Sequence, residues 1–291
     1  MRVIIIGLSL VLAGCGDDAG DAGDTRVTDT QIGTDTSVDT TDTIATEDTA
    51  TEDTAATDTA SDDIGAVDGT TAADMDADEV GITLPLPGFG AISGDCGVLD
   101  DELTADGPSY FVTRFDFGTD PYDAADLDLL TDGAKEILAD GNAGGSSIRS
   151  EMFTFELLAR CELATLVKTE NEVVYDDLQS KKTDMILRID DLLIGVNPTR
   201  AIGYPFDAPY TEAQAKTILE KKLGDINEST TYVSAADRWE KQILVVFAYA
   251  DGHAASVQAA WGALPAELKR DTIALVVITD GADTFIYSDQ E

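Results

Sequence analysis

The residues best suited to chemistry in this chain lie in the segment KTDMILRIDDLLIGVNPTR, residues 182–200. Asp184 opens one apolar stretch, a polar turn follows it, and a second apolar stretch runs into Asn197 and Thr199. Two apolar stretches joined by a short polar turn predict a β-hairpin. Carboxylate and carbonyl oxygens are the ligands that Mg²⁺ prefers. The hairpin therefore places one candidate cation ligand, Asp184, at the start of its first strand.

This hairpin resembles that of restriction-endonuclease-like, or PD-(D/E)xK, nucleases, which carry an aspartate on the first strand and Glu-x-Lys on the second. The resemblance implies that Asp184 is the metal-binding aspartate, and it places Asn197 at the glutamate and Thr199 at the lysine. An asparagine offers only a neutral oxygen, and a threonine cannot supply positive charge. The family chemistry needs Mg²⁺ held by carboxylates with a lysine nearby, so the hairpin alone is incomplete.

Two glutamates outside the hairpin could complete a metal site. Glu156 interrupts the apolar face of a predicted helix, where some members of the fold keep a metal-binding glutamate; alternatively it pairs with Arg160, four residues later. Glu172 could project in the same direction as Asp184, or it is a solvated strand residue. The candidate catalytic residues are thus Asp184, Glu156, Glu172 and Asn197, and the candidate metal ligands are Asp184 and Glu156.

A replacement for the missing lysine is available close to the hairpin. Lys182 or Arg200 could supply the charge, although Arg200 directly follows Thr199 and should point to the opposite face of the sheet. The alternative for Asp184 is a solvated carboxylate at a strand end, paired with Lys181 or Lys182. If these carboxylates bind metal, the sequence predicts a Mg²⁺-dependent enzyme. If they are only solvated or ion-paired, it predicts a scaffold for which no cofactor is expected.

The elements around the hairpin follow the order α-β-β-β-α-β-α-β over residues 146–291. Helical spacing of apolar residues predicts helices from 146 or 147 to 163, from 211 with a capping box at Thr211 and Gln214, and over 254–264. Alternating or continuous apolar runs predict strands over 164–175, 183–189, 192–199, 242–249, 272–279 and 284–287. We expect a three-layer α/β domain with a mixed sheet, and the resemblance implies the restriction-endonuclease-like order.

Residues 81–145 precede this core and are rich in Gly, Asp and turn signals, with one strand-like run over 109–117 and helical turns within 124–138. We interpret them as an N-terminal elaboration of the domain. Cys96 in this region and Cys161 in the core form an even pair, which predicts a disulfide in an exported protein. The alternative is two buried free thiols.

The N-terminus has the features of an export signal. Arg2 precedes an apolar run of 11 residues, Val3 to Ala13, which is too short to span a bilayer because a spanning helix needs ~20 residues. The sequence LAGC that ends at Cys15 resembles the lipobox of bacterial lipoproteins. The resemblance implies removal of residues 1–14 and lipidation of Cys15; an ordinary secretory signal is the alternative. In the lipoproteins that this segment resembles, an aspartate directly after the lipidated cysteine retains the protein in the inner membrane. Here Asp17 lies one place later, so the resemblance implies the outer membrane.

Residues 15–80 repeat Thr, Asp and Ala, with no aromatic residue and no proline, and we expect a disordered acidic tether. Residues 1–80 hold 20 acidic and 2 basic residues, which leaves 37 acidic and 16 basic residues in 81–291, a net charge of −21. Both parts are acidic, so a nucleic acid partner is disfavoured.

These features predict a lipid-anchored cell-envelope protein whose nuclease-like domain, residues 146–291, is a non-catalytic binding or structural module for an envelope or extracellular partner. The alternative is a metal-dependent phosphodiesterase of the PD-(D/E)xK type. The module hypothesis predicts an exposed aromatic patch formed by Tyr204, Phe206 and Tyr210. The runs SEMFTFELLAR, KTENEVVYDD, KTDMILRIDD and KQILVV also resemble an uncharacterised protein family, which implies no activity.

Overall fold

A computed structural model describes residues 82–142, 148–206 and 208–288. The predicted signal peptide, the lipidation site at Cys15 and the acidic tether lie outside the described residues. Among the described residues, no helix combines the length and the apolar character that a membrane crossing requires.

The described residues form an α/β structure around a mixed sheet of seven strands in the order β1-β2-β7-β6-β5-β4-β3. The strands β2, β7, β6 and β5 are parallel to one another, whereas β1 is antiparallel to β2 and β4 is antiparallel to both β5 and β3. The bounds are β1 Ala91–Gly94, β2 Ser109–Asp116, β3 Thr165–Thr169, β4 Met185–Ile189, β5 Leu192–Ala201, β6 Lys241–Ala248 and β7 Ile273–Asp280.

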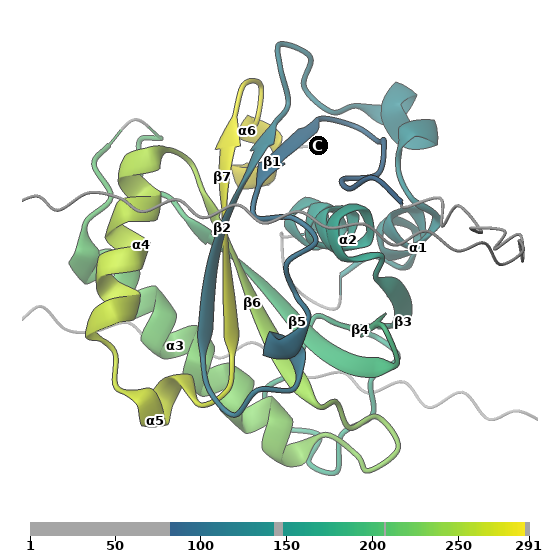
Figure 1. Ribbon diagram of the computed structural model, residues 1–291, viewed down its shortest axis with the longest axis vertical. Coiled ribbons are helices and arrows are strands. Elements are labelled where there is room, and N and C mark those ends of the chain that lie inside the picture. The colour runs from purple at the N-terminus through teal and green to yellow at the C-terminus, as the bar shows by residue number, and fades with distance from the viewer. Residues whose placement is uncertain (1–81, 143–147, 207, 289–291) are drawn as a thin grey trace, which may run out of the picture. The chain divides into compact units, whose positions relative to one another are not determined.

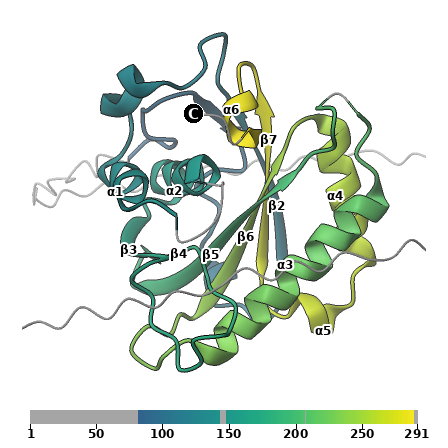
Figure 2. The same ribbon diagram turned by 180° about the vertical axis from the view of Figure 1, so that it is seen from behind.

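Helices cover both faces of the sheet, so the structure has three layers (Figures 1 and 2). The helices α1, α2 and α6 pack with one hydrophobic core, and α3 and α4 pack with a second core on the opposite face. The helices are α1 Asp132–Asp140, α2 Ile148–Glu162, α3 Glu212–Tyr232, α4 Asp251–Ala263, α5 Ala266–Lys269 and α6 Thr284–Tyr287, with short 3-10 turns at Asp101–Leu103 and Ala124–Leu129.

The central strands follow directly from their composition. All residues of β6 are buried, and β7 is buried as far as Thr279, as expected for strands covered on both faces. The hairpin is confirmed as β4 and β5, with Met185 opposite Val196. The predicted capping box of α3 is also confirmed, because the Thr211 and Gln214 side chains bind each other's backbone N–H groups.

Two predicted strands are wrong in extent or type. The strand expected over 164–175 ends at Thr169, where the Glu172 carboxylate accepts a hydrogen bond from the Thr169 backbone over 3.0 Å and closes a turn. The last predicted strand, 284–287, is the helix α6. Its apolar residues Phe285, Ile286 and Tyr287 are all buried, which suits a helical turn closing the end of the core better than a strand.

The N-terminal elaboration contributes two strands to the sheet. β2 pairs in parallel with β7 along its whole length, and β1 adds an edge beside β2. Phe115 and Phe117 from this region stack on each other and join Phe153 of α2 in the core. Residues 82–142 therefore complete the core that covers α2.

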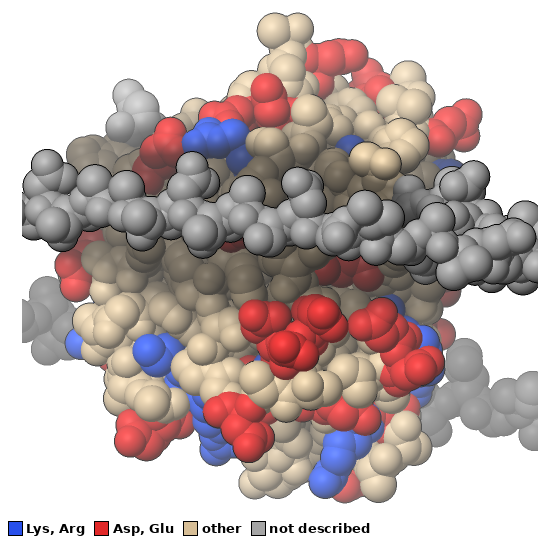
Figure 3. All heavy atoms as spheres, viewed as in Figure 1, with Lys and Arg blue, Asp and Glu red and all other residues tan. Residues whose placement is uncertain are grey.

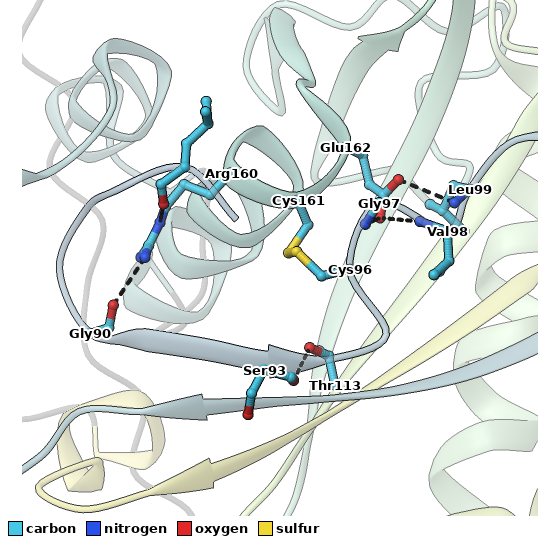
Figure 4. The surroundings of a disulfide bond; sticks show 11 residues. Gly90, Ser93, Cys96, Gly97, Val98, Leu99, Thr113, Arg160, Cys161 and Glu162 are labelled. Atoms are coloured by element: carbon cyan, nitrogen blue, oxygen red, sulfur yellow. Dashed lines mark hydrogen bonds between the residues drawn. A yellow bond between two sulfur atoms is a disulfide. The ribbon is translucent and has the colours of Figure 1, made fainter. Parts of the chain in front are cut away.

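Three consecutive residues at the end of α2 hold this region in place (Figure 4). Cys161 forms the predicted disulfide with Cys96, with an S–S distance of 2.10 Å. Arg160 donates hydrogen bonds to the carbonyls of Leu86, Phe89 and Gly90, at 2.7–3.0 Å. The Glu162 carboxylate accepts hydrogen bonds from the backbone N–H groups of Gly97, Val98 and Leu99, at 2.9–3.3 Å.

Because of these contacts, the environment of α2 differs from the one that the sequence predicts. The apolar spacing predicts one buried face and a more polar side that carries Cys161, but all residues from Ser150 to Cys161 are buried. The sheet covers one side of the helix and residues 84–99 cover the other. The charged residues Glu151, Glu156 and Arg160 are therefore inside the protein, and each must find a polar partner there.

Candidate functional site

Three carboxylates converge beside the start of β4. Glu151 lies in the first turn of α2, Glu170 directly follows β3, and Asp184 directly precedes β4. One carboxylate oxygen from each lies within 4.8 Å of the others. We call Glu151, Glu170 and Asp184 the acidic triad. Glu151 is buried, and the other two are half-buried.

Strand pairing explains how two members of the acidic triad meet. β3 and β4 are antiparallel, and their last pair is Thr169 opposite Met185. Glu170 and Asp184 are the next residues outward, so they lie side by side where the ladder ends. The third member, Glu151, approaches from the helix layer, where it also accepts a hydrogen bond of 2.6 Å from the Asn142 amide.

Asn197 fixes the position of Asp184 from the second arm of the hairpin. Its amide nitrogen donates to Oδ2 of Asp184 over 2.9 Å, and its Oδ1 accepts from the Thr183 hydroxyl over 3.0 Å. Asn197 is only 5% exposed. A carboxylate has two oxygens with several lone pairs, so this bond orients Asp184 and leaves it able to bind a cation.

The Asp184 carboxyl titrates far above its usual range. Burial, which disfavours the charged form, raises its pKa to about 6, and the neighbouring carboxylates of Glu170 and Asp225 act in the same direction. The positive charge of Lys222 and the hydrogen bond from Asn197 oppose this shift. A bound cation would relieve the same repulsion, so the site is electrostatically prepared for positive charge.

Lys222 supplies a positive charge near the acidic triad from α3, on the sheet face opposite α2. Lys221 and Lys181 both pair with Asp225, at 2.9 and 3.8 Å.

The two residues that were predicted to replace the missing motif lysine, Lys182 and Arg200, have different surroundings. Lys182 is exposed, and its backbone carbonyl accepts a bond from Asn197. Arg200 donates to the Tyr287 carbonyl over 3.1 Å, so its guanidinium reaches α6.

Glu156, the second metal ligand expected from sequence, lies outside the acidic triad. Its Oε2 accepts hydrogen bonds from the backbone N–H and the hydroxyl of Thr131, at 2.9 and 2.7 Å. It therefore anchors the start of α1, and its charge also stabilises the Arg160 guanidinium. Glu156 is five residues beyond Glu151, about 140° around the helix axis, so the two side chains leave α2 in different directions.

Glu172 is likewise outside the acidic triad. It is exposed, and its carboxylate closes the turn after β3 through the Thr169 backbone. Of the four candidates from sequence, the structure therefore brings together Asp184 and Asn197. Sequence reasoning missed Glu151, Glu170 and Lys222, because their side chains come from three elements far apart in the chain.

The donor set of the acidic triad suits a hard divalent cation. Oxygens on opposite sides of Mg²⁺ at ~2.1 Å lie ~4.2 Å apart, and those on opposite sides of Ca²⁺ at ~2.4 Å lie ~4.8 Å apart. The separations of up to 4.8 Å between triad oxygens match this range. The amide of Asn197 orients one ligand, as hydrogen-bonded neighbours of metal ligands commonly do.

The expected aromatic patch after the hairpin does not form as a unit. Tyr204 is 92% exposed, but Phe206 packs against the rings of Tyr249 and Tyr287, and Tyr210 is buried. A single exposed ring is too small a surface to indicate a docking site.

Comparison with known proteins gives little further information. No family model matches the chain, and no solved structure matches it. A protein of Dictyostelium discoideum, "AAC-rich mRNA clone AAC4 protein", is 38% identical over 154 residues. The match covers 51% of this chain and 22% of that protein, so the chain spans less than a quarter of the relative's length. The name of that protein states no activity.

Proposed function

We propose that this protein is a lipid-anchored phosphodiesterase of the cell envelope, whose α/β domain binds a divalent cation at the acidic triad. The observation that carries the proposal is the convergence of Glu151, Glu170 and Asp184 within 4.8 Å, close to the positive charge of Lys222. Cation-assisted phosphodiester hydrolysis can use both of these features, because carboxylates hold the cation and a positive side chain stabilises the developing negative charge. The motif positions Asn197 and Thr199 provide neither a carboxylate nor a positive charge. Carboxylates come instead from Glu151 and Glu170, and the positive charge comes from Lys222.

The order of elements supports a restriction-endonuclease-like scaffold. The helix α2, the meander β3-β4-β5, the helix α3 and the strand β6 follow one another along the chain, as the resemblance implies. Asp184 precedes the second strand of the meander, and Glu151 comes from the helix before it. In this proposal Asp184 takes the role of the metal-binding aspartate, and Glu151 takes the role of the helical glutamate in place of Glu156, which binds Thr131.

Each residue of the site has a separate task in this proposal. The acidic triad holds the cation, and Asn197 keeps Asp184 in the orientation needed to ligate. A Mg²⁺ or Mn²⁺ ion held by these three carboxylates would supply Lewis-acid activation of a phosphoryl oxygen or of a water molecule. The ammonium group of Lys222 stabilises the negative charge that develops on the phosphoryl oxygens.

The charge of the protein points to a small substrate. The residues from 81 onwards carry a net charge of −21, and acidic side chains gather in several groups on the face shown in Figure 3. A long polyanion would be repelled over most of this surface. A small phosphodiester contacts only the site itself, where Lys222 and the bound cation offset the local negative charge.

The experiment that tests the proposal uses the exported chain with Cys15→Ser, which removes the lipid attachment site and keeps Cys96 and Cys161. Hydrolysis of bis(p-nitrophenyl) phosphate is measured with Mn²⁺, Mg²⁺ or EDTA, and Mn²⁺ binding is measured by titration calorimetry. We expect Mn²⁺-dependent hydrolysis that Asp184→Ala abolishes. Glu172→Gln is the matched control, because Glu172 is an exposed carboxylate near the acidic triad that does not belong to it.

Each outcome has a separate meaning. Hydrolysis that survives EDTA or Asp184→Ala would contradict the proposed mechanism. Mn²⁺ binding without hydrolysis would favour the non-catalytic module, for which the neutral Asn197 and Thr199 at the motif positions are the supporting observation. Absence of Mn²⁺ binding at millimolar concentration would contradict the phosphodiesterase proposal and leave the module for which no cofactor is expected. The membrane anchor is tested independently, by whether the wild-type chain but not Cys15→Ser partitions with the outer membrane.

A further inference from the structure

Two joined cavities form a groove between α1 and β3, which are neighbours in Figures 1 and 2. The first cavity, of about 400 Å³, lies where α1 and β3 begin and is lined mainly by apolar side chains, among them Leu86, Phe155 and Leu166. The second, of about 300 Å³, lies where both elements end, and Glu136 lines both cavities. We call them together the α1–β3 groove. None of its lining residues belongs to the acidic triad.

Contacts from α2 hold the walls of the first cavity in place. The N–H of Leu86 donates to the Arg160 carbonyl over 2.9 Å, and its carbonyl accepts from the Arg160 guanidinium over 2.8 Å. The Glu156 carboxylate accepts hydrogen bonds from the backbone and the hydroxyl of Thr131, which lines the cavity where α1 begins. The groove is therefore pre-formed, and a ligand can dock without first ordering its walls.

Leu163 lines the first cavity in an unusual conformation. It directly follows α2 and has a φ of 54°, in the left-handed region where glycine or asparagine is usual after a helix. Its side chain is 44% exposed, so packing in the core does not offset the cost of this conformation. A strained leucine that displays an apolar surface to solvent is better explained by a contact with a partner than by folding.

The second cavity offers two available carboxylates. Glu136 is exposed and has no hydrogen bond or ion pair among the described residues. Asp140 is also exposed, and hydrogen bonds from Thr169 and Asn171 to one of its oxygens hold its pKa below the usual range. Its other oxygen has no partner among the described residues. Both carboxylates are therefore suited to bind a lysine or an arginine.

The charge of the groove discriminates between possible occupants. A second copy of this chain is disfavoured, because residues 81–291 carry a net charge of −21. The chain's own residues 1–80 hold 20 acidic and only 2 basic residues, so they are repelled as well. An anionic lipid surface is disfavoured for the same reason. A basic segment of another protein is complementary to the groove.

The separation of the two cavities sets the spacing of the residues that can fill them. The first cavity contacts β3 at Leu166 and the second at Thr169, three residues or ~10 Å further along the strand. Side chains on one face of an extended peptide are ~7 Å apart at a spacing of two residues and ~13 Å apart at a spacing of four. One extended segment can therefore reach both cavities.

We propose that the α1–β3 groove docks an extended segment of a partner protein. The segment places an apolar side chain in the first cavity and a lysine or arginine, two to four residues away, against Glu136 and Asp140. The inference goes beyond the proposed function, because the docking needs neither a cation nor the acidic triad.

The test uses the peptide acetyl-Thr-Leu-Thr-Lys-Thr-Lys-Thr-amide and the peptide of reversed sequence, because a segment can enter the groove in either direction. Binding to the Cys15→Ser chain, with its disulfide intact, is followed by methyl NMR. We expect saturable shifts of the Leu163 and Leu166 methyl groups with at least one of the two peptides. Replacing the peptide's leucine by serine, or both of its lysines by glutamate, should weaken binding by about tenfold or more.

One variant tests the apolar end of the groove without endangering the fold. Leu163→Asn removes the apolar side chain and introduces a residue that tolerates the left-handed conformation, so the variant should fold normally. It should weaken peptide binding by about tenfold or more. Leu178→Asn is the matched control and should leave binding unchanged, because Leu178 is 78% exposed and does not line the groove.

A second variant tests the acidic end by exchange of charge. Glu136→Lys should weaken binding of the lysine peptide by about tenfold or more and strengthen binding of the glutamate peptide. Glu267→Lys changes the net charge of the protein equally and should do neither, because Glu267 is exposed in α5 and outside the groove.

The outcomes separate docking from the other occupants and from the proposed function. Asp184→Ala should keep peptide binding, so a loss of Mn²⁺ binding or of hydrolysis leaves this inference intact. No binding of either peptide at millimolar concentration, or binding insensitive to both Leu163→Asn and Glu136→Lys, would overturn it. So would shifts of the Leu163 and Leu166 methyl groups that appear with phosphatidylglycerol vesicles, or with rising protein concentration, but not with the peptides.

Discussion

The amide nitrogen of Asn197 lies 2.9 Å from Oδ2 of Asp184, and this hydrogen bond joins the two arms of the hairpin at the acidic triad. A neutral side chain therefore stands beside Asp184 where the restriction-endonuclease resemblance implies a second carboxylate. With an Asp or Glu at this position, repulsion would raise the pKa of Asp184 further. The asparagine instead donates to the carboxylate and lowers its pKa. The other two acidic groups of the triad are Glu151 and Glu170, and neither comes from β5.

Cation binding should depend on pH through Asp184. Its pKa is raised to about 6 by burial, so protons compete with the cation below that pH. We expect the apparent Kd for Mn²⁺ to rise by about tenfold per pH unit as the pH falls below 6 and to level off above 7. Calorimetric titrations between pH 5 and 8 check this. An affinity that stays constant across that range would show that Asp184 is not a ligand.

The same shift should make Asp184 a source of instability without a cation. Because its folded pKa of about 6 exceeds the usual 3.8, the folded protein binds the proton more tightly than the unfolded chain. The contribution of Asp184 to stability is therefore largest below pH 4 and is lost as the pH rises through 6, by on the order of 2–3 kcal/mol. Asp184→Asn should raise the free energy of unfolding in EDTA by ~1–2 kcal/mol at pH 8 and change little at pH 4.

Urea unfolding of the wild type and Asp184→Asn at both pH values measures this difference. Glu172→Gln is the control, because its exposed carboxylate should give no pH-dependent gain. A destabilised Asp184→Asn variant at pH 8 in EDTA would contradict the electrostatic account of the site. Added Mn²⁺ should stabilise the wild type and leave Asp184→Asn unchanged.

Lys222 should affect catalysis more than cation binding. Lys222→Met removes the positive charge that, in the proposed mechanism, stabilises the negative charge on the phosphoryl oxygens. The kcat for bis(p-nitrophenyl) phosphate should therefore fall by ~10²-fold or more. The Kd for Mn²⁺ should change by less than about tenfold, because Lys222 is not a ligand. Lys216→Met is the control, since Lys216 is exposed in the same helix and pairs with Glu220. Equal effects of the two variants on kcat would contradict the role of Lys222.

The disulfide should contribute substantially to stability. Cys96 and Cys161 are 65 residues apart, and closing a loop of that length is worth about 4 kcal/mol in the chain-entropy model. Replacing both cysteines by Ala should lower the free energy of unfolding by ~3–4 kcal/mol, measured by urea denaturation. A reducing agent should weaken the wild type and leave the double variant unchanged. Equal stability of the two proteins would mean that Arg160 and Glu162 hold residues 84–99 without the cross-link.

Local patterns in the sequence determined most of the elements. The continuous apolar runs of β6 and β7 identify buried strands because strands covered on both faces need no polar residue. The capping box at Thr211 and Gln214 marks the start of α3, since those side chains bind backbone groups within four residues. The pairing of Cys96 with Cys161 was predicted from their even number, and the hairpin brings Asp184 to Asn197 by its own register.

Only the tertiary structure decided which charged residues meet. Glu151, Glu170, Asp184 and Lys222 belong to different elements, and no spacing along the chain connects them. Their meeting depends on where α2 and α3 pack on the two faces of the sheet and where the β3–β4 ladder ends. The burial of α2 on all sides depends in the same way on residues 82–142. Their strand β2 joins the sheet by pairing with β7. Packing between distant segments is set by side-chain fit in three dimensions, which a one-dimensional pattern of residue types does not encode.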